Sequence, residues 1–174
     1  MRRVLPAAAA RLVVLVLLVV SVAACASRTH VTLPAVGPSG AAASAAATAS
    51  PAEPATGELV VYSDAIPVAK HRSPPEFAHT GYVVRKAGYE QVVAQVDNRV
   101  SEADETPDAL RLPPGLYEVD ARCAGLGTVL VPVVIEAGRR TEVYLDAGGM
   151  PAKQAAALTD PVRLPDGKVV GARP

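Results

Sequence analysis

The chain is poor in aromatic residues and has no excess of either charge. Its 174 residues include one Phe and no Trp, and Lys plus Arg balance Asp plus Glu at 17 each. Any core must therefore be built from Val, Leu and Ile. Neutralising a phosphate backbone needs clustered Lys and Arg, which are absent. We therefore expect no nucleic acid as a partner.

The sequence also lacks an apolar run long enough to cross a bilayer. Residues 12–24 (LVVLVLLVVSVAA) form an uncharged stretch of 13 residues that follows Arg2, Arg3 and Arg11. A spanning helix needs about 20 apolar residues. A signal-peptide core needs roughly 7–15. The pattern predicts a cleaved signal over residues 1–24.

The apolar stretch ends in Val22-Ala23-Ala24-Cys25, which resembles the lipobox of bacterial lipoproteins. The resemblance implies cleavage before Cys25, a diacylglycerol on its sulfur and an acylated amino group. Two or more acyl chains give stable membrane anchoring. Because Ala26 is not Asp, the family's sorting rule implies the outer membrane if the host has two. An ordinary secretory signal beside a cysteine is the alternative.

Low-complexity sequence follows the anchor. Residues 26–57 contain 26 Ala, Ser, Thr, Pro or Gly out of 32, with prolines spaced to break any helix. We expect a flexible, disordered linker over residues 25–57, which would let a folded domain stand several nanometres off the membrane. A filler of no selected length is the alternative. Without the signal, 14 basic face 17 acidic residues, a formal charge of −3.

Residues 58–147 have the pattern of a β domain. Within Tyr117–Cys123 apolar residues alternate with charged ones, which indicates a half-buried antiparallel strand. The pattern predicts an all-β fold, a small antiparallel β-sandwich of about seven strands. The expected strands are 59–62, 81–86, 91–96, 109–112, 117–123, 128–135 and 141–145.

Residues 112–146 are similar to the second half of carboxypeptidase-regulatory-like and transthyretin-like sandwich domains. The similarity is carried by Leu112, Pro113, Gly115, Tyr117, Val119, Gly138, Thr141, Val143 and Leu145. It implies the fold and an accessory or binding role, and it brings no catalytic residues.

The strand at 128–135 (TVLVPVVI) offers a candidate contact surface. Pro132 cannot donate to a β-ladder, so this strand should lie at a sheet edge or carry a bulge. A partner strand could then add beside Val131, Pro132 and Val133. Cys123 falls on the inward face of its strand and is interpreted as a small apolar residue, with a reactive thiol as the alternative.

Weak metal-ligand candidates are His71, Glu76 and His79. Two imidazoles and a carboxylate suit zinc, but their spacing matches no known ligand motif, and Pro74-Pro75 favours a solvated loop. The acidic stretch 98–108 lacks the regular spacing of a calcium loop. We expect no cofactor.

The tail, residues 148–174, contains a candidate helix at 152–158. A candidate hairpin surrounds Pro165-Asp166-Gly167. An isolated hairpin is marginal in water. The tail therefore either docks on the sandwich or is disordered, and both alternatives stay open.

These observations favour a non-enzymatic, membrane-anchored envelope lipoprotein whose β-sandwich is a structural or protein-binding module. One alternative is a module for envelope polysaccharide, for which Tyr89 is the best exposed aromatic candidate. Another is a metal-dependent enzyme built on the histidines.

Overall fold

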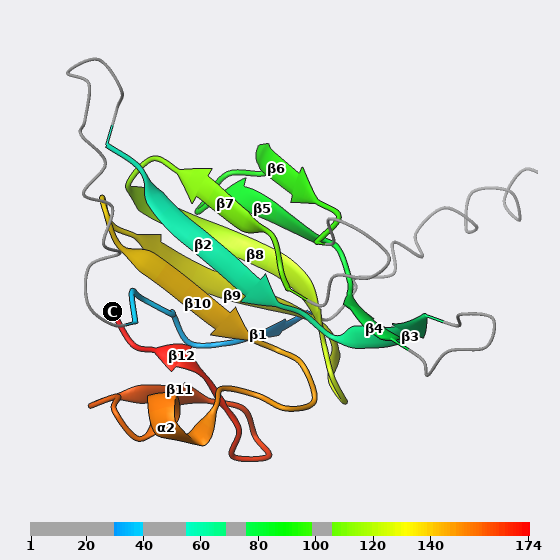
Figure 1. Ribbon diagram of the computed structural model, residues 1–174. Coiled ribbons are helices and arrows are strands. Elements are labelled where there is room, and N and C mark those ends of the chain that lie inside the picture. Colours follow the sequence, from blue (N-terminus) through cyan, green and yellow to red (C-terminus); the bar gives the residue numbers. More distant parts are fainter. Residues whose placement is uncertain (1–29, 40–54, 69–75, 99–105) are drawn as a thin grey trace, which may run out of the picture.

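The computed structural model describes residues 30–39, 55–68, 76–98 and 106–174. These residues form a β protein with one short helix (Figure 1). In chain order the elements are β1 (Val31–Thr32), β2 (Gly57–Tyr62), β3 (Ala65–Val68), β4 (Glu76–His79), β5 (Tyr82–Lys86), β6 (Val92–Val96), β7 (Ala109–Leu112), β8 (Gly115–Cys123), β9 (Gly127–Ile135), β10 (Arg140–Tyr144), α2 (Ala152–Ala155), β11 (Pro161–Arg163) and β12 (Val169–Ala172).

Two sheets build the sandwich. A five-stranded sheet has the order β1-β9-β8-β5-β6, and a three-stranded sheet has the order β10-β2-β7. The expected all-β, sandwich-like fold is confirmed, but it is not wholly antiparallel, because β1 runs parallel to β9 and β10 runs parallel to β2. All seven strands predicted from alternation are present, each within two residues of its expected bounds.

The alternation along β8 sets the inner and outer faces of the larger sheet. Tyr117, Val119, Ala121 and Cys123 are each at most 2% exposed, and they join one core with inward residues of β2, β9 and β10. The intervening charged residues lie on the outer face, where Arg85 and Asp120 form an ion pair at 3.2 Å. The alternation of apolar and charged residues along β8 therefore determines which side chains enter the core, as the sequence predicted.

The N-terminal segment, residues 31–39, corrects the expected linker over 25–57. β1 pairs in parallel with the start of β9, and the side chains of Leu33 and Val36 are 5% and 0% exposed in the core. The free energy gained by burying these two apolar side chains exceeds the entropy lost when the small residues and prolines around them become ordered. Residues 40–54 of the expected linker lie outside the described residues.

The same segment corrects the predicted partner edge at Val131, Pro132 and Val133. The side chains of Val131 and Val133 are at most 1% exposed. On the backbone, the carbonyl of Pro132 accepts from the N–H of Val36 at 2.9 Å, and the N–H of Val134 donates to the carbonyl of Val36 at 2.8 Å. The edge exists as Pro132 indicated, but the chain's own N-terminal segment covers it.

Beyond Val36, the N-terminal segment continues along the second sheet. The N–H of Gly37 donates to the carbonyl of Ala172 in β12 at 2.8 Å, and the N–H of Ser39 donates to the carbonyl of Arg140 in β10 at 3.2 Å. The segment therefore bridges β9, β12 and β10 along one side of the sandwich. Figure 1 shows it in light blue between β10 and β12.

The tail is docked, which decides between the two alternatives left by the sequence. Strands β11 and β12 form the expected hairpin, and Val162, Leu164 and Val170 belong to the main core. A smaller cluster adds Met150 and Val169 against Tyr144. The helix is shorter than expected, four residues at 152–155. The folded domain therefore extends past both ends of the predicted 58–147 unit.

A further hairpin was not predicted. β3 and β4 pair antiparallel, with Ile66 opposite Ala78 and Pro67 opposite Phe77, where the sequence indicated a solvated loop. Residues 69–75 between the two strands lie outside the described residues. Among the residues that are described, no helix is long and apolar enough to span a membrane.

Candidate functional site

A buried polar network joins the two sheets beside β6 and β7. Asn98 is 1% exposed and has a φ of 60°, a left-handed conformation that Asn tolerates better than most residues. Its amide donates to the carbonyl of Val61 at 2.9 Å and to the Ser63 hydroxyl at 3.0 Å, and its oxygen accepts from the N–H of Asp108 at 3.2 Å. These contacts link β2 to the segments that follow β6 and precede β7.

Ser63 and His79 lie in this network without forming a nucleophile–base pair. The Ser63 hydroxyl donates to the carbonyl of Thr80. The Nδ1 atom of His79 lies 2.6 Å from the Ser63 carbonyl, which can only accept, so Nδ1 carries the proton. A serine nucleophile needs its hydroxyl bonded to the base. This geometry instead stabilises the base of the β3–β4 hairpin.

Of the three metal candidates, His79 is the one whose side chain the structure describes. His71 lies outside them, and for Glu76 the structure gives the backbone pairing with Val68. His79 is 9% exposed and contacts the ring of Tyr62 edge-on at 5.8 Å. Within the described ranges no group of three or more His, Cys, Asp or Glu is placed to hold a metal ion.

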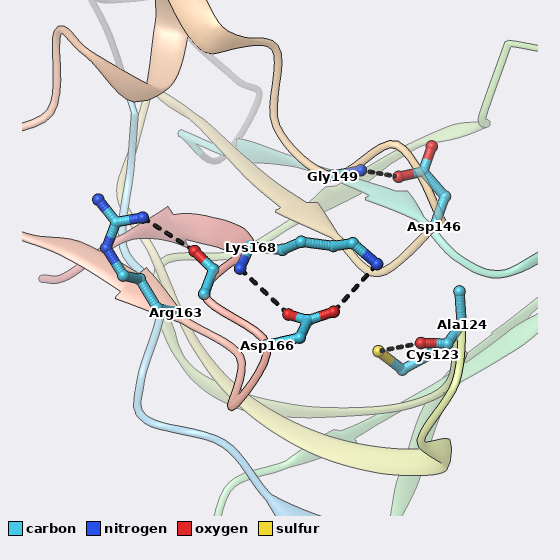
Figure 2. A network of polar contacts seen from close by, with 8 residues as sticks. Cys123, Ala124, Asp146, Gly149, Arg163, Asp166 and Lys168 are labelled. Carbon is cyan, nitrogen blue, oxygen red and sulfur yellow. Dashed lines mark hydrogen bonds and ion pairs between the residues drawn. The ribbon is translucent and has the colours of Figure 1, made fainter.

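Cys123 is buried, and Figure 2 draws it with the charged residues Asp146, Asp166 and Lys168. The residue is 1% exposed and its thiol donates to the carbonyl of Ala124 at 3.8 Å, while Asp166 pairs with Lys168 at 3.0 Å. Burial, followed by the negative charge of Asp166, raises the pKa of the thiol. A reactive cysteine needs a lowered pKa and access, so the apolar interpretation is confirmed.

The tyrosines do not form an exposed platform. Tyr82, Tyr117 and Tyr144 are at most 4% exposed, and Tyr62 is half-buried with its ring stacked on Tyr144 at 4.3 Å. Tyr89, in the β5–β6 turn, is 67% exposed. All five tyrosines lie within the described residues. One isolated exposed ring gives little stacking surface for a sugar.

The two sheets differ in how their outer edges are protected. β7 ends the smaller sheet, carries Arg111 and is followed by Pro113 and Pro114. Charge and proline are common guards against strand addition. β6 ends the larger sheet with the sequence VVAQV, which contains neither. A bulge against β5 is the protection that β6 shows.

Exposed apolar side chains gather beside this unguarded edge. Val92 and Val93 of β6 are 50% and 43% exposed, Tyr89 is 67% exposed and Leu116 of β8 is 59% exposed. We call these four residues the distal patch. The N–H of Ala87 donates to the carbonyl of Leu116 at 3.1 Å, which holds the β5–β6 turn beside β8.

A second group of exposed apolar residues lies at the opposite end of the strands. Val31 and Ile66 are each 43% exposed, Phe77 is 51% exposed and Leu126 is 37% exposed. We call these four residues the proximal patch. Figure 1 shows the β3–β4 hairpin and the β8–β9 turn at one end of the sandwich and the β5–β6 turn at the other.

Sequence reasoning found the turn with Tyr89 but neither patch nor the polar network. The exposure of Val92 and Val93 depends on which strand ends the sheet, and alternation does not encode strand order. Asn98 gave no signal beyond its place before an acidic stretch. The chain matches no family model, no curated protein and no solved structure.

Proposed function

We propose that this chain is an envelope lipoprotein, anchored by lipid on Cys25, whose β-sandwich is a non-enzymatic protein-binding module. The observation that carries the binding role is the β6 edge, which is uncharged, free of proline and flanked by the exposed distal patch. The lipobox-like sequence before Cys25 supports the anchor. If the host has two membranes, the outer one is the proposed location.

The proposed mode of binding is strand addition. An end strand presents alternate backbone N–H and C=O groups outward, and an extended segment of an envelope protein can pair with them. Because β6 has no charged residue, the partner strand should be uncharged and should place apolar side chains over Val92 and Val93. The similarity to accessory sandwich domains supports the same role.

The polysaccharide alternative is less well supported. Tyr89 is the one tyrosine with a largely exposed ring, and its neighbours in the distal patch are aliphatic. Sugar recognition by stacking uses aromatic faces, whereas strand pairing uses backbone groups and apolar side chains. The distal patch, with three aliphatic side chains and one aromatic ring, is better suited to strand pairing.

Photo-crosslinking in intact cells tests the protein-binding role. A photoreactive residue at Val93 in the β6 edge should give an adduct with a protein, and the same residue at Arg111 in the guarded β7 edge is the matched control. An adduct of twice the chain's mass would identify a second copy as the partner. Equal adducts from both positions, or none from Val93, would overturn the proposal.

A gatekeeper substitution adds an independent test. Val93→Lys places a charge on the open edge, and it should abolish the adduct formed from a photoreactive residue at Val92. Because Val93 is 43% exposed, the free energy of unfolding should change by less than about 0.5 kcal/mol. An undiminished adduct would contradict pairing along β6.

A further inference from the structure

The paired N-terminal segment shortens the reach of the anchor. Val31 is paired into the sheet beside Val129, so five residues, 26–30, separate Cys25 from β1 in the sequence. Six residue steps span at most about 20 Å. Residues 40–54 cannot lengthen this reach, because they run between Ser39 and Ala55, which both belong to the described domain.

The strand register shows which end of the domain is held close. Val31 lies beside Val129, near the Gly127 end of β9 and next to the β8–β9 turn that contains Leu126. The β3–β4 hairpin lies at the same end, because the N–H of Asp64 donates to the carbonyl of Arg122 at 2.9 Å. A lipid on Cys25 therefore holds this end toward the bilayer.

The end that is held close is also the end that carries the proximal patch. Val31, Ile66, Phe77 and Leu126 are each between 37% and 51% exposed. Beside them the side chain of Arg122 is 58% exposed, with Asp64 at 3.8 Å. Exposed apolar side chains suit the boundary between lipid headgroups and acyl chains, and the Arg122–Asp64 pair beside them carries no net charge.

We propose that this end rests on the surface of the lipid bilayer, with the proximal patch in the headgroup region. The proposal depends on the proposed function through the lipid on Cys25. It replaces a domain standing several nanometres off the membrane with a domain lying on it. β9 has nine residues, about 26 Å of strand, so the distal patch lies farther out, on the side away from the lipid.

Depth-dependent fluorescence quenching tests the orientation. The full-length protein, purified from membranes, is reconstituted in vesicles of phosphatidylcholine and phosphatidylglycerol that contain headgroup-spin-labelled lipid. A fluorophore is attached at Leu126→Cys or, as the matched control, at Ala137→Cys in the β9–β10 turn at the other end. Cys123 is buried and should not react.

Quenching at position 126 should exceed quenching at position 137 several-fold. Mass spectrometry of the same sample separates the two proposals. Lipid on Cys25 with equal quenching at the two positions overturns the orientation and leaves the anchor standing. Absence of lipid from Cys25 overturns the anchor itself.

A pair of double variants tests the lipid contact. Ile66→Ser with Phe77→Ser should lower the quenching at position 126 by at least half. The matched control, Val92→Ser with Val93→Ser in the distal patch, should leave it unchanged. Circular dichroism establishes that each variant is folded. Undiminished quenching in the folded Ile66→Ser, Phe77→Ser variant contradicts a contact with lipid.

Discussion

The two sides of the sandwich are completed in different ways. On the side of β9 and β10, the N-terminal segment fills the edge with backbone hydrogen bonds and buries Leu33 and Val36. On the side of β6 and β7, no further strand of the described residues pairs with either edge, and the network around Asn98 links the sheets. The chain itself completes one side, the closed side, and the other, the open side, carries the edge that we propose as the partner site.

The largest effect should come from placing a charge in the closed side. Val36→Asp puts a carboxylate where the side chain is 0% exposed, and an unpaired buried charge costs about 3–5 kcal/mol. Urea unfolding should show this loss. Val31→Asp is the control in the same segment, since Val31 is 43% exposed and should tolerate the charge. If both variants lost a similar free energy of unfolding, burial of the charge would not be the cause of the loss in Val36→Asp.

On the open side, removal of the Asn98 side chain should cost somewhat less. Asn98→Ala leaves the Asp108 N–H and the Val61 carbonyl without this partner and places Ala at a φ of 60°. We expect a loss of about 2–3 kcal/mol in the free energy of unfolding. Asn98→Gly removes the same hydrogen bonds but tolerates a positive φ, so its free energy of unfolding should fall less than that of Asn98→Ala. A larger loss of stability in the glycine variant would contradict a contribution from backbone strain at position 98.

A close approach within the closed side predicts a third effect. A Cβ atom at Gly171 would lie 2.9 Å from the carbonyl oxygen of Glu142 and would overlap the side chain of Val36. Gly171→Ala should therefore lower the free energy of unfolding by about 1–3 kcal/mol. Gly148→Ala is the control, because its Cβ would meet only Asp146, at 3.8 Å. No difference between the two would argue against tight packing of β12 on the N-terminal segment.

The smallest effect concerns Tyr82, in the sheet that ends at the open side. Its hydroxyl is buried without a hydrogen-bond partner among the described residues, so Tyr82→Phe should change the free energy of unfolding at pH 7 by less than about 1 kcal/mol. A higher free energy of unfolding in Tyr82→Phe would agree with a buried hydroxyl that has no hydrogen-bond partner among the described residues. A loss well above this figure would indicate a hydrogen bond to the hydroxyl.

The pH dependence of the same variant gives a second measurement. Burial, followed by the charge of Asp108, raises the pKa of Tyr82 above its ordinary value of 10.0. The folded state then binds the proton more tightly, so this contribution is complete below pH 10.0 and is lost as the pH rises further. Tyr82→Phe should lose less stability than the parent protein in alkaline urea titrations. Parallel curves would place the hydroxyl in solvent.

Short β-branched runs, alternation and turn residues were sufficient to predict the seven central strands. Six of these strands contain buried residues, whereas β6 has none. The N-terminal segment was missed because Leu33 and Val36 are isolated among small residues and prolines, and they become a core pattern only beside β9. Pro132 indicated an edge correctly. The segment that covers this edge lies more than 90 positions earlier in the chain. A local sequence pattern cannot reveal such a distant pairing.

The candidate site was predicted less well than the fold. Val131 and Val133 were proposed as contact residues because Pro132 indicates an edge strand, but their side chains are buried in the core. The unguarded edge of β6 depends on the order of strands in the sheet. The lipid anchor at Cys25 stays a prediction from sequence, and it lies outside the described residues.

The parallel pairing of β1 with β9 also determines how the domain would respond to mechanical force. If the proposed anchor were pulled away from the domain, the force would enter at the N-terminal end of β1, so the hydrogen bonds of Leu33 and Val36 would be loaded together, in shear. Rupture of these bonds and of those made by Gly37 and Ser39 would free the chain from Val31 to Thr56, about 85 Å at full extension. The N-terminal segment would then lengthen the connection between the proposed anchor and the proposed partner.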